Sequence, residues 1–199
     1  MKITTHLGEV QIVDEPAYTF GSADNVRSYH FASNLSSESN PVSVHGVLLN
    51  DEPLVVIGAT GGATGINPHS ALWLNDRLYL AVCDTVTCIK LSPCEIFWSL
   101  RVDSATCFGI HFHAETKSLL SHGELEITRF TEAGSILWQS GGYDIFTGAF
   151  TLTPSFIEVE DFEGYRHRFL YTTGKMPHRP STEGDVQGLA PLNAPHVKR

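Results

Sequence analysis

Several features that mark other classes of protein are missing from this sequence. Apolar runs are short, as in Leu54–Ile57, which is flanked by Pro53 and Gly58. Such a run is far shorter than the roughly 18 apolar residues of a membrane-spanning helix. The N-terminal stretch Met1–Gly8 has no apolar core of the kind found in a secretory signal peptide. We therefore expect no membrane partner and a cytoplasmic location.

Positive charge is also scarce. The chain has 13 Lys+Arg against 22 Asp+Glu, which gives a formal net charge of -9. An average field of this sign repels a phosphate backbone, so we expect no nucleic-acid partner. The densest basic cluster is Arg166-His167-Arg168. A cluster this short is typical of the solvated face of a strand.

Cysteine motifs for metal or redox chemistry are absent as well. The four cysteines, Cys83, Cys88, Cys94 and Cys107, include no Cys-x-x-Cys pair. A zinc ribbon is therefore not predicted. Without a secretory signal, free thiols in a reducing compartment are expected. Cys107 precedes His111 by four residues, but no nucleophile signature flanks it, and its setting is more typical of a small core residue.

Helical periodicity is weak, whereas strand patterning runs through the chain. The helix candidate is Ser22–Tyr29, and its apolar spacing is poor. Elsewhere, apolar and polar residues alternate with period two and are interrupted by Gly, Pro, Asn and Asp, as in the hairpin turns at 50–53 and 75–76. About sixteen strands are indicated. The sequence predicts an all-β, antiparallel fold with one domain over 1–175 and an extended Pro- and Gly-rich tail over 176–199.

An internal repeat organises these strands. The segments Leu78–Trp98 and Leu119–Trp138 both read as strands and turns that end in two apolar residues and a tryptophan, and Phe156–Lys175 is a third copy without the tryptophan. The two tryptophans are 40 residues apart. This is the length of a four-stranded propeller blade. We expect propeller-like repeats of about 40 residues in roughly four small sheets, with Trp98 and Trp138 buried at equivalent positions; an irregular β-sandwich is the alternative.

The last repeat offers three strands where the preceding one offers four. The missing strand would leave an unpaired sheet edge over the region 146–171. The N-terminal hairpin, 2–6 and 9–14, has no evident partner in its own neighbourhood. We therefore expect one of these N-terminal strands to pair with the C-terminal blade and close the molecule.

The repeats resemble those of a known family. The segments Glu95–Trp98 and Ser135–Trp138 are similar to the tryptophan-docking repeats of quinoprotein-like (PQQ-type) β-propellers. Ser121–Ile127 and Asp144–Gly148 also resemble segments of small bacterial proteins of this type. The resemblance implies a propeller-like architecture. Quinoprotein dehydrogenases are far longer and bind quinone and calcium, so no catalytic residue or cofactor is carried over from them.

A glycine-rich segment follows the apolar run. The whole segment Leu54–Gly65 reads like a strand that enters a dinucleotide-binding loop, in which glycines allow the backbone to approach a pyrophosphate. That motif requires a helix directly afterwards, and the segment 66–70 leads instead into an alternating hairpin. A glycine-rich loop between strands is the favoured interpretation.

Histidines provide the candidate site. His111 and His113 are two residues apart, so in a strand they share one face, and His122 follows on what we expect to be the paired strand. A polar strand face with ordinary exposed histidines is the alternative, and the spacing does not decide between the two. The candidate metal ligands are His111, His113 and His122, and the candidate ligand-facing residues around them are His69, Glu124, Glu126 and Asp144.

These observations leave two functions open. The first is a non-catalytic binding or scaffold module that presents loops on a rigid propeller-like frame. The second is a small metal-binding protein or metal-dependent enzyme that uses the histidines and carboxylates. The partner would be a protein or a small molecule, no cofactor other than a metal ion is expected, and open sheet edges are consistent with a homodimer.

Overall fold

The structure is a computed structural model that describes residues 1–36 and 40–176. These residues form sixteen β-strands and no helix, so none of them lies in a helix that could cross a membrane. The candidate helix at 22–29 is a series of turns and bends. The predicted all-β fold is confirmed. Of the predicted tail, only Met176 lies within the described residues.

The strands form four sheets, which we number in chain order. The first sheet has the order β1-β2-β4-β5-β3 and contains β1 (Lys2–Thr5), β2 (Gly8–Asp14), β3 (Phe31–Asn34), β4 (Ser43–Leu49) and β5 (Glu52–Ala59). The second contains β6 (Ala71–Leu74), β7 (Arg77–Val82), β8 (Thr85–Leu91) and β9 (Cys94–Arg101). The third contains β10 (Cys107–His113), β11 (Ser118–Gly123), β12 (Glu126–Phe130) and β13 (Ile136–Gly141). The fourth contains β14 (Phe146–Leu152), β15 (Phe156–Asp161) and β16 (Arg166–Leu170).

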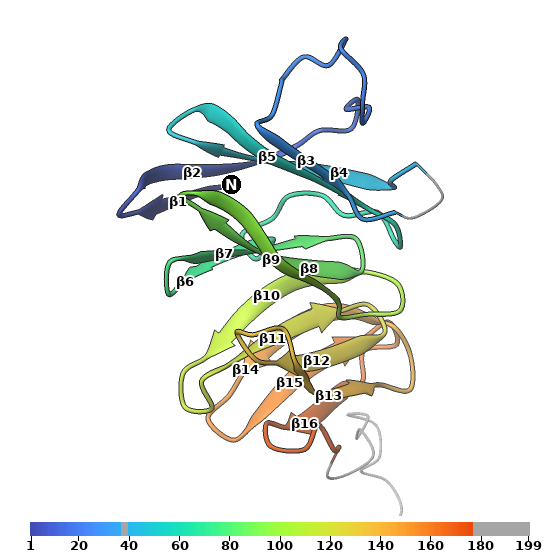
Figure 1. Cartoon of the computed structure of the whole chain (residues 1–199). Coiled ribbons are helices and arrows are strands. Elements are labelled where there is room, and N and C mark those ends of the chain that lie inside the picture. Colours follow the sequence, from blue (N-terminus) through green and yellow to red (C-terminus); the bar gives the residue numbers. More distant parts are fainter. Residues whose placement is uncertain (37–39, 177–199) are drawn as a thin grey trace, which may run out of the picture.

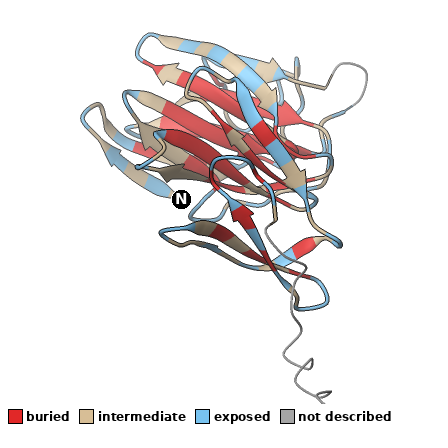
Figure 2. Ribbon diagram, turned by 90° about the horizontal axis from the view of Figure 1, so that it is seen from below, coloured by how far each residue is buried: buried red, intermediate tan, exposed pale blue. Residues whose placement is uncertain are grey.

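The four sheets follow one another in chain order, and the first and fourth lie at opposite ends of the molecule (Figure 1). Strand pairs are antiparallel except for β3 and β5, which are parallel. Apolar side chains fill each interface between neighbouring sheets, with Leu80, Phe130 and Phe169 among the fully buried ones. Figure 2 shows the buried residues concentrated in the inner strands, whereas outer strands are exposed or intermediate along much of their length. This is the predicted set of four small propeller-like sheets and not a two-layer sandwich.

The repeat is visible in the strand register. In each of the first three sheets, the register shifts within one antiparallel strand pair: β4 with β5, β8 with β9, and β12 with β13. The residue beside the shift on the second strand of each pair is Val55, Trp98 and Trp138, respectively. A bulge of this kind bends the strand and raises its twist, which lets each sheet curve over the next. The predicted equivalence of Trp98 and Trp138 is therefore confirmed.

Trp138 links the third sheet to the fourth. Its side chain is 9% exposed, and its Nε1–H donates to the carbonyl of Tyr171 at 2.7 Å. Gly174, whose φ is +66°, lies flat against the indole, and a Cβ on this residue would come within 2.5 Å of the ring. A side chain at Gly174 would therefore both strain the backbone and collide with the tryptophan.

Trp98 repeats this contact one interface earlier. Its Nε1–H donates to the carbonyl of Glu132 at 3.1 Å, and Gly134 lies against its ring. The ring also packs edge-on against Phe130, with centroids 6.1 Å apart. Trp98 is only partly buried, whereas the sequence predicts that both tryptophans are buried.

The predicted closure by the N-terminal hairpin is wrong. β1 pairs with β2, and β2 pairs with β4, with Ile12 opposite Val47. Val10 and Ile12 are fully buried between the first and second sheets, and this burial holds the hairpin at the N-terminal end of the molecule. The fourth sheet is left with three strands among the described residues.

The outer face of the first sheet is covered by the segment between β2 and β3. Tyr18, Phe20 and Tyr29 pack on Val44 and other apolar residues of the sheet. The Tyr29 ring occupies the space above Gly46, which a side chain there would fill. This cover removes from water the apolar face that a further sheet would otherwise bury.

The outer face of the fourth sheet is charged. Glu158 on β15 accepts a hydrogen bond from Arg168 on β16 at 2.9 Å and lies 3.8 Å from Arg166. Arg166 also lies 3.6 Å from Glu160. Terminal repeats of stacked proteins carry polar outer faces because no neighbour buries them. Among the described residues, the outer face of the first sheet is thus covered by aromatic side chains and that of the fourth sheet is polar.

Candidate functional site

The three candidate metal ligands lie on the face of the third sheet that packs against the fourth. His111 and His113 belong to β10, and His122 on β11 pairs with Gly109, two residues before His111. The shared face expected for His111 and His113 is present. This face meets the fourth sheet.

His111 and His122 enclose a phenylalanine of the fourth sheet. Phe150 stacks on His111 with ring centroids 4.5 Å apart and on His122 at 4.6 Å, with interplanar angles of 29° and 17°. His69, which precedes β6, packs on His111 at 4.5 Å. We call these four rings the histidine column. Each ring contact contributes to packing between sheets because offset stacking adds to the area buried.

His113 lies apart from the histidine column. Its ring stacks on Tyr171 at 3.7 Å with an interplanar angle of 11°, and its Nδ1 hydrogen-bonds with the Thr116 hydroxyl at 2.8 Å. The structure therefore brings together His69, His111 and His122, and separates them from His113. Within 1–36 and 40–176, no group of three His, Cys, Asp or Glu side chains is arranged to hold a metal ion.

Burial sets the charge state of the histidine column. Loss of hydration lowers the pKa of His111 to about 3, and the nearby His69 and His122 lower it further. The pKa of His122 falls to about 4 through burial and the influence of His69. The Nε2 atom of His122 is buried and has no hydrogen-bond partner among the described residues. Both rings are therefore neutral at pH 7 and act there as packing groups.

The candidate carboxylates do not join the histidines. The backbone of Glu124 bridges the sheets, donating to the Thr106 carbonyl and accepting from the Phe146 N–H, both at 2.7 Å. Glu126 accepts hydrogen bonds through its side chain from Ser104 and Gln139. The exposed Asp144 caps its own turn by accepting the Ile145 N–H at 2.7 Å. No hydrogen bond or ion pair links these carboxylates to the histidine column in the described part of the chain.

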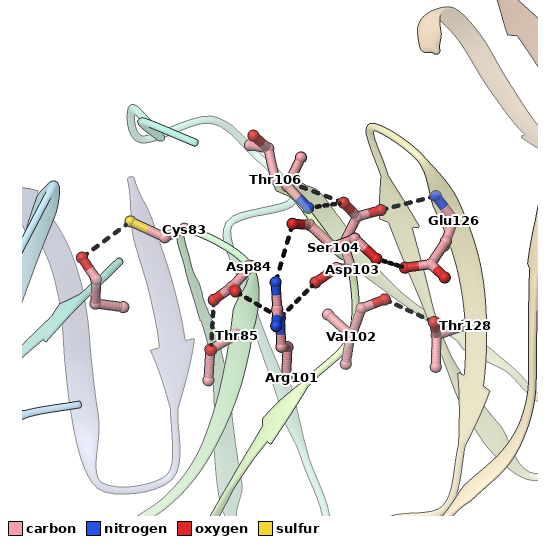
Figure 3. A network of polar contacts seen from close by, with 12 residues as sticks. Cys83, Asp84, Thr85, Arg101, Val102, Asp103, Ser104, Thr106, Glu126 and Thr128 are labelled. Atoms are coloured by element: carbon pink, nitrogen blue, oxygen red, sulfur yellow. Dashed lines mark hydrogen bonds and ion pairs between the residues drawn. The ribbon is translucent and has the colours of Figure 1, made fainter. Parts of the chain in front are cut away.

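A polar network absent from the sequence prediction surrounds Asp103. Its carboxylate is 1% exposed and accepts four backbone N–H groups, those of Ala105, Thr106, Leu125 and Glu126, at 2.6 to 3.0 Å (Figure 3). Burial raises the pKa of Asp103, and the four donors oppose that rise by favouring the charged form. The carboxylate fixes the linker after β9 onto the turn before β12, which is a structural role.

We expect the substitution Asp103→Asn to destabilise the protein by about 2–4 kcal/mol, because the new amide NH₂ would face backbone donors and leave them unsatisfied. Chemical denaturation followed by circular dichroism measures the free energy of unfolding. Ser104→Ala is the matched control: its neighbouring hydroxyl is exposed, and its loss should change stability by no more than about 0.5 kcal/mol. Equal stabilities for the two variants would contradict this role for Asp103.

The cysteines are structural. All four are free thiols, and Cys83, Cys88 and Cys107 are buried. Burial raises the pKa of Cys88 to about 11 and that of Cys107 to about 12. The Cys107 thiol donates to the Gly109 carbonyl rather than to a histidine. Thiols with such pKa values are poor nucleophiles, which agrees with the core assignment made from the sequence.

The glycine-rich segment is a loop between the first two sheets. No helix follows Gly65, as the sequence predicts. Gly62 donates its N–H to the Ala105 carbonyl at 2.7 Å, and the Thr64 hydroxyl accepts the Cys83 N–H at 3.0 Å. The Thr64 N–H donates to the Ser43 hydroxyl at 2.9 Å, so the N–H groups of Gly62 and Thr64 are engaged within the protein.

Comparison with known proteins gives no family. No family model and no curated protein matches the chain. Among solved structures, it is similar to BamB from Moraxella catarrhalis, with a TM-score of 0.49 and 14% identity over 79% of this chain and 52% of that one. It is also similar to the quinohemoprotein alcohol dehydrogenase from Comamonas testosteroni, with a TM-score of 0.43 and 13% identity over 59% and 20% of the two chains. The computationally designed protein Ika8 gives a TM-score of 0.48 and 11% identity over 73% and 49%.

The chain spans about half the length of BamB and of Ika8, and a fifth of the dehydrogenase. At these TM-scores the likenesses carry no argument about function. The assignment of a propeller-like all-β class rests on the strand order and register described above.

Proposed function

We propose that this protein is a non-catalytic binding or scaffold module built on a propeller-like frame of four sheets. The observation that supports the proposal is how the reactive side chains are used. The histidine column packs two sheets together, Asp103 caps a linker, and the buried thiols have raised pKa values. An active site needs such groups near solvent and within reach of a substrate, whereas these groups are engaged in holding the frame.

A metal-dependent function is the alternative, and metal content separates the two. We expect the purified full-length protein to contain only substoichiometric zinc, iron, copper and calcium by inductively coupled plasma mass spectrometry. The reason is that stacking on Phe150 and Tyr171 directs the ring planes, rather than the ring nitrogens, toward one another. A ligand set requires nitrogen or oxygen atoms that point at one position.

The variant His111→Phe controls this measurement. It keeps an aromatic ring against Phe150 and removes two nitrogens. A stoichiometric metal in the parent protein that disappears in His111→Phe would contradict the binding module and establish the metal site instead.

A further inference from the structure

The fourth sheet has three strands among the described residues, one fewer than the second and third sheets. In the second and third sheets, the third strand pairs on its outer side with a fourth, β9 or β13. In the fourth sheet, β16 occupies the third position, and none of residues 1–36 and 40–176 forms a strand on its outer side. Edge strands present unpaired N–H and C=O groups and are templates for another strand.

The turn after β16 begins in the same way as the turn that leads into β13. Before β13, the Thr131 N–H donates to the Ser135 carbonyl at 2.9 Å. After β16, the Leu170 N–H donates to the Lys175 carbonyl at 3.1 Å. The chain after β16 thus turns back beside the outer edge of that strand, as the chain after β12 does before β13. In the sequence, Pro177 and Pro180 follow, and proline has no N–H with which to pair.

The backbone groups available on this edge are those of Arg166 and Arg168. The Leu170 N–H points away from β15, toward the Lys175 carbonyl. Backbone N–H groups two residues apart in a strand point to the same side, so those of Arg168 and Arg166 also point away from β15. Their side chains are 56% and 66% exposed and lie on the outer face of the sheet. The intervening His167 is buried and faces the molecule.

The strand already paired with the other side of β16 indicates which chemistry fits. β15 reads Phe-Ile-Glu-Val-Glu-Asp, and it places Glu158 opposite Arg168 and Glu160 opposite Arg166. The alternate residues Ile157 and Val159 are fully buried. A strand on the outer edge of β16 would meet the same two arginines. Opposite charges directly across a strand pair are favourable and like charges are not.

A second copy of β16 fits this edge poorly. An antiparallel pair centred on Arg168 would place that guanidinium opposite its own copy, and the like charges would repel. A strand that alternates acidic and apolar residues avoids this repulsion.

We propose that the outer edge of β16, which pairs with no strand of residues 1–36 and 40–176, is a docking site for an extended segment of a partner protein that alternates acidic and apolar residues. The segment adds a fourth strand to the fourth sheet. This proposal rests on the proposed binding function and names its binding site. Main-chain hydrogen bonds supply affinity, and the Arg166 and Arg168 side chains select the sequence.

The test uses the ¹⁵N-labelled full chain and two synthetic peptides, Phe-Ile-Glu-Val-Glu-Asp and its counterpart with both Glu residues replaced by Lys. We expect the acidic peptide to bind with a Kd below about 1 mM and the lysine peptide to bind at least about tenfold more weakly. Binding should shift the amide signals of Arg166 and Arg168 and slow their hydrogen exchange. Rapid exchange of these two amides in the free protein is part of the expected result.

Three substitutions of Arg168 test whether the peptide binds at the outer edge of β16. Arg168→Pro removes the outward N–H, and we expect it to weaken peptide binding at least about tenfold relative to Arg168→Ala, which keeps that N–H. Arg168→Glu leaves the backbone intact and should reverse the preference in favour of the lysine peptide. It therefore keeps the proposal testable even where the proline variant fails to fold.

Several results would overturn the proposal. They are equal affinity for both peptides, no binding at millimolar concentration, shifts confined to other strands, and slow exchange of both amides in the free monomer. Dimerisation that is lost in Arg168→Pro would assign the edge to a second copy instead. None of these results bears on metal content, so failure of the docking site and failure of the proposed function are distinguishable.

Discussion

Acidification from pH 7 to pH 5 should lower the free energy of unfolding by about 4 kcal/mol, through His111 and His122. Both rings are partly buried as neutral groups, with pKa values lowered to about 3 and about 4, against about 6.5 in the unfolded chain. The unfolded state therefore takes up protons that the folded state does not. The stability that the two neutral histidines contribute is fully present above the pKa of histidine in the unfolded chain. It is lost progressively as the pH falls from that value toward the lowered pKa of the folded state.

Urea unfolding at a series of pH values measures this slope. The range above pH 5 avoids most titration of carboxylates. The double variant His111→Phe/His122→Phe keeps rings on both sides of Phe150 and removes these two titrating groups, so its stability should fall less than the parent's between pH 7 and pH 5. The remaining dependence includes His45, whose pKa burial also lowers. A parent protein whose stability is constant over this range, or a double variant with the parent's slope, would refute the assignment.

Replacing Trp138 with Ala should destabilise the protein by about 3–5 kcal/mol, the range for truncating a large buried aromatic side chain. The indole is 9% exposed, fills the space above Gly174 and donates to the Tyr171 carbonyl. Its loss opens a cavity between the third and fourth sheets. Thermal and urea unfolding of the variant measure the effect.

Phe97→Ala and Trp98→Ala complete this series. Phe97 is 41% exposed, so its loss should have a small effect, and the partly buried Trp98 should be intermediate. This ranking follows burial rather than residue size. A Trp138→Ala variant that melts within a degree or two of the parent would show that the indole does not hold the two sheets together.

The sheet architecture could be predicted from the sequence because its determinants are local. Period-two alternation and turn residues fixed the hairpins, and the spacing of Trp98 and Trp138 fixed the repeat. The position of the N-terminal hairpin could not be predicted in this way. It depends on which apolar surface Val10 and Ile12 cover, and alternation within β2 is equally compatible with pairing to either end of the chain.

The candidate site was harder to predict than the fold. Spacing placed His111 and His113 on one face, which is the arrangement in the structure, but it carried no information about what that face meets. Phe150, which stacks on both His111 and His122, lies in a strand with an irregular register and has no distinctive sequence context. Asp103 was missed because a lone aspartate after a strand reads as an ordinary turn residue.

The recurring tryptophan contact has a consequence for how this chain changes in length. Trp98 and Trp138 make the same contact across two successive interfaces between sheets: the indole N–H donates to a backbone carbonyl, and a glycine packs against the ring. Duplication of one 40-residue unit in the middle of the chain would therefore create a third contact of the same kind, without a new type of interface between sheets. Duplication at the N-terminus would first have to displace Tyr18, Phe20 and Tyr29. Lineages of such proteins are thus expected to gain and lose units internally while retaining the aromatic cover at the beginning.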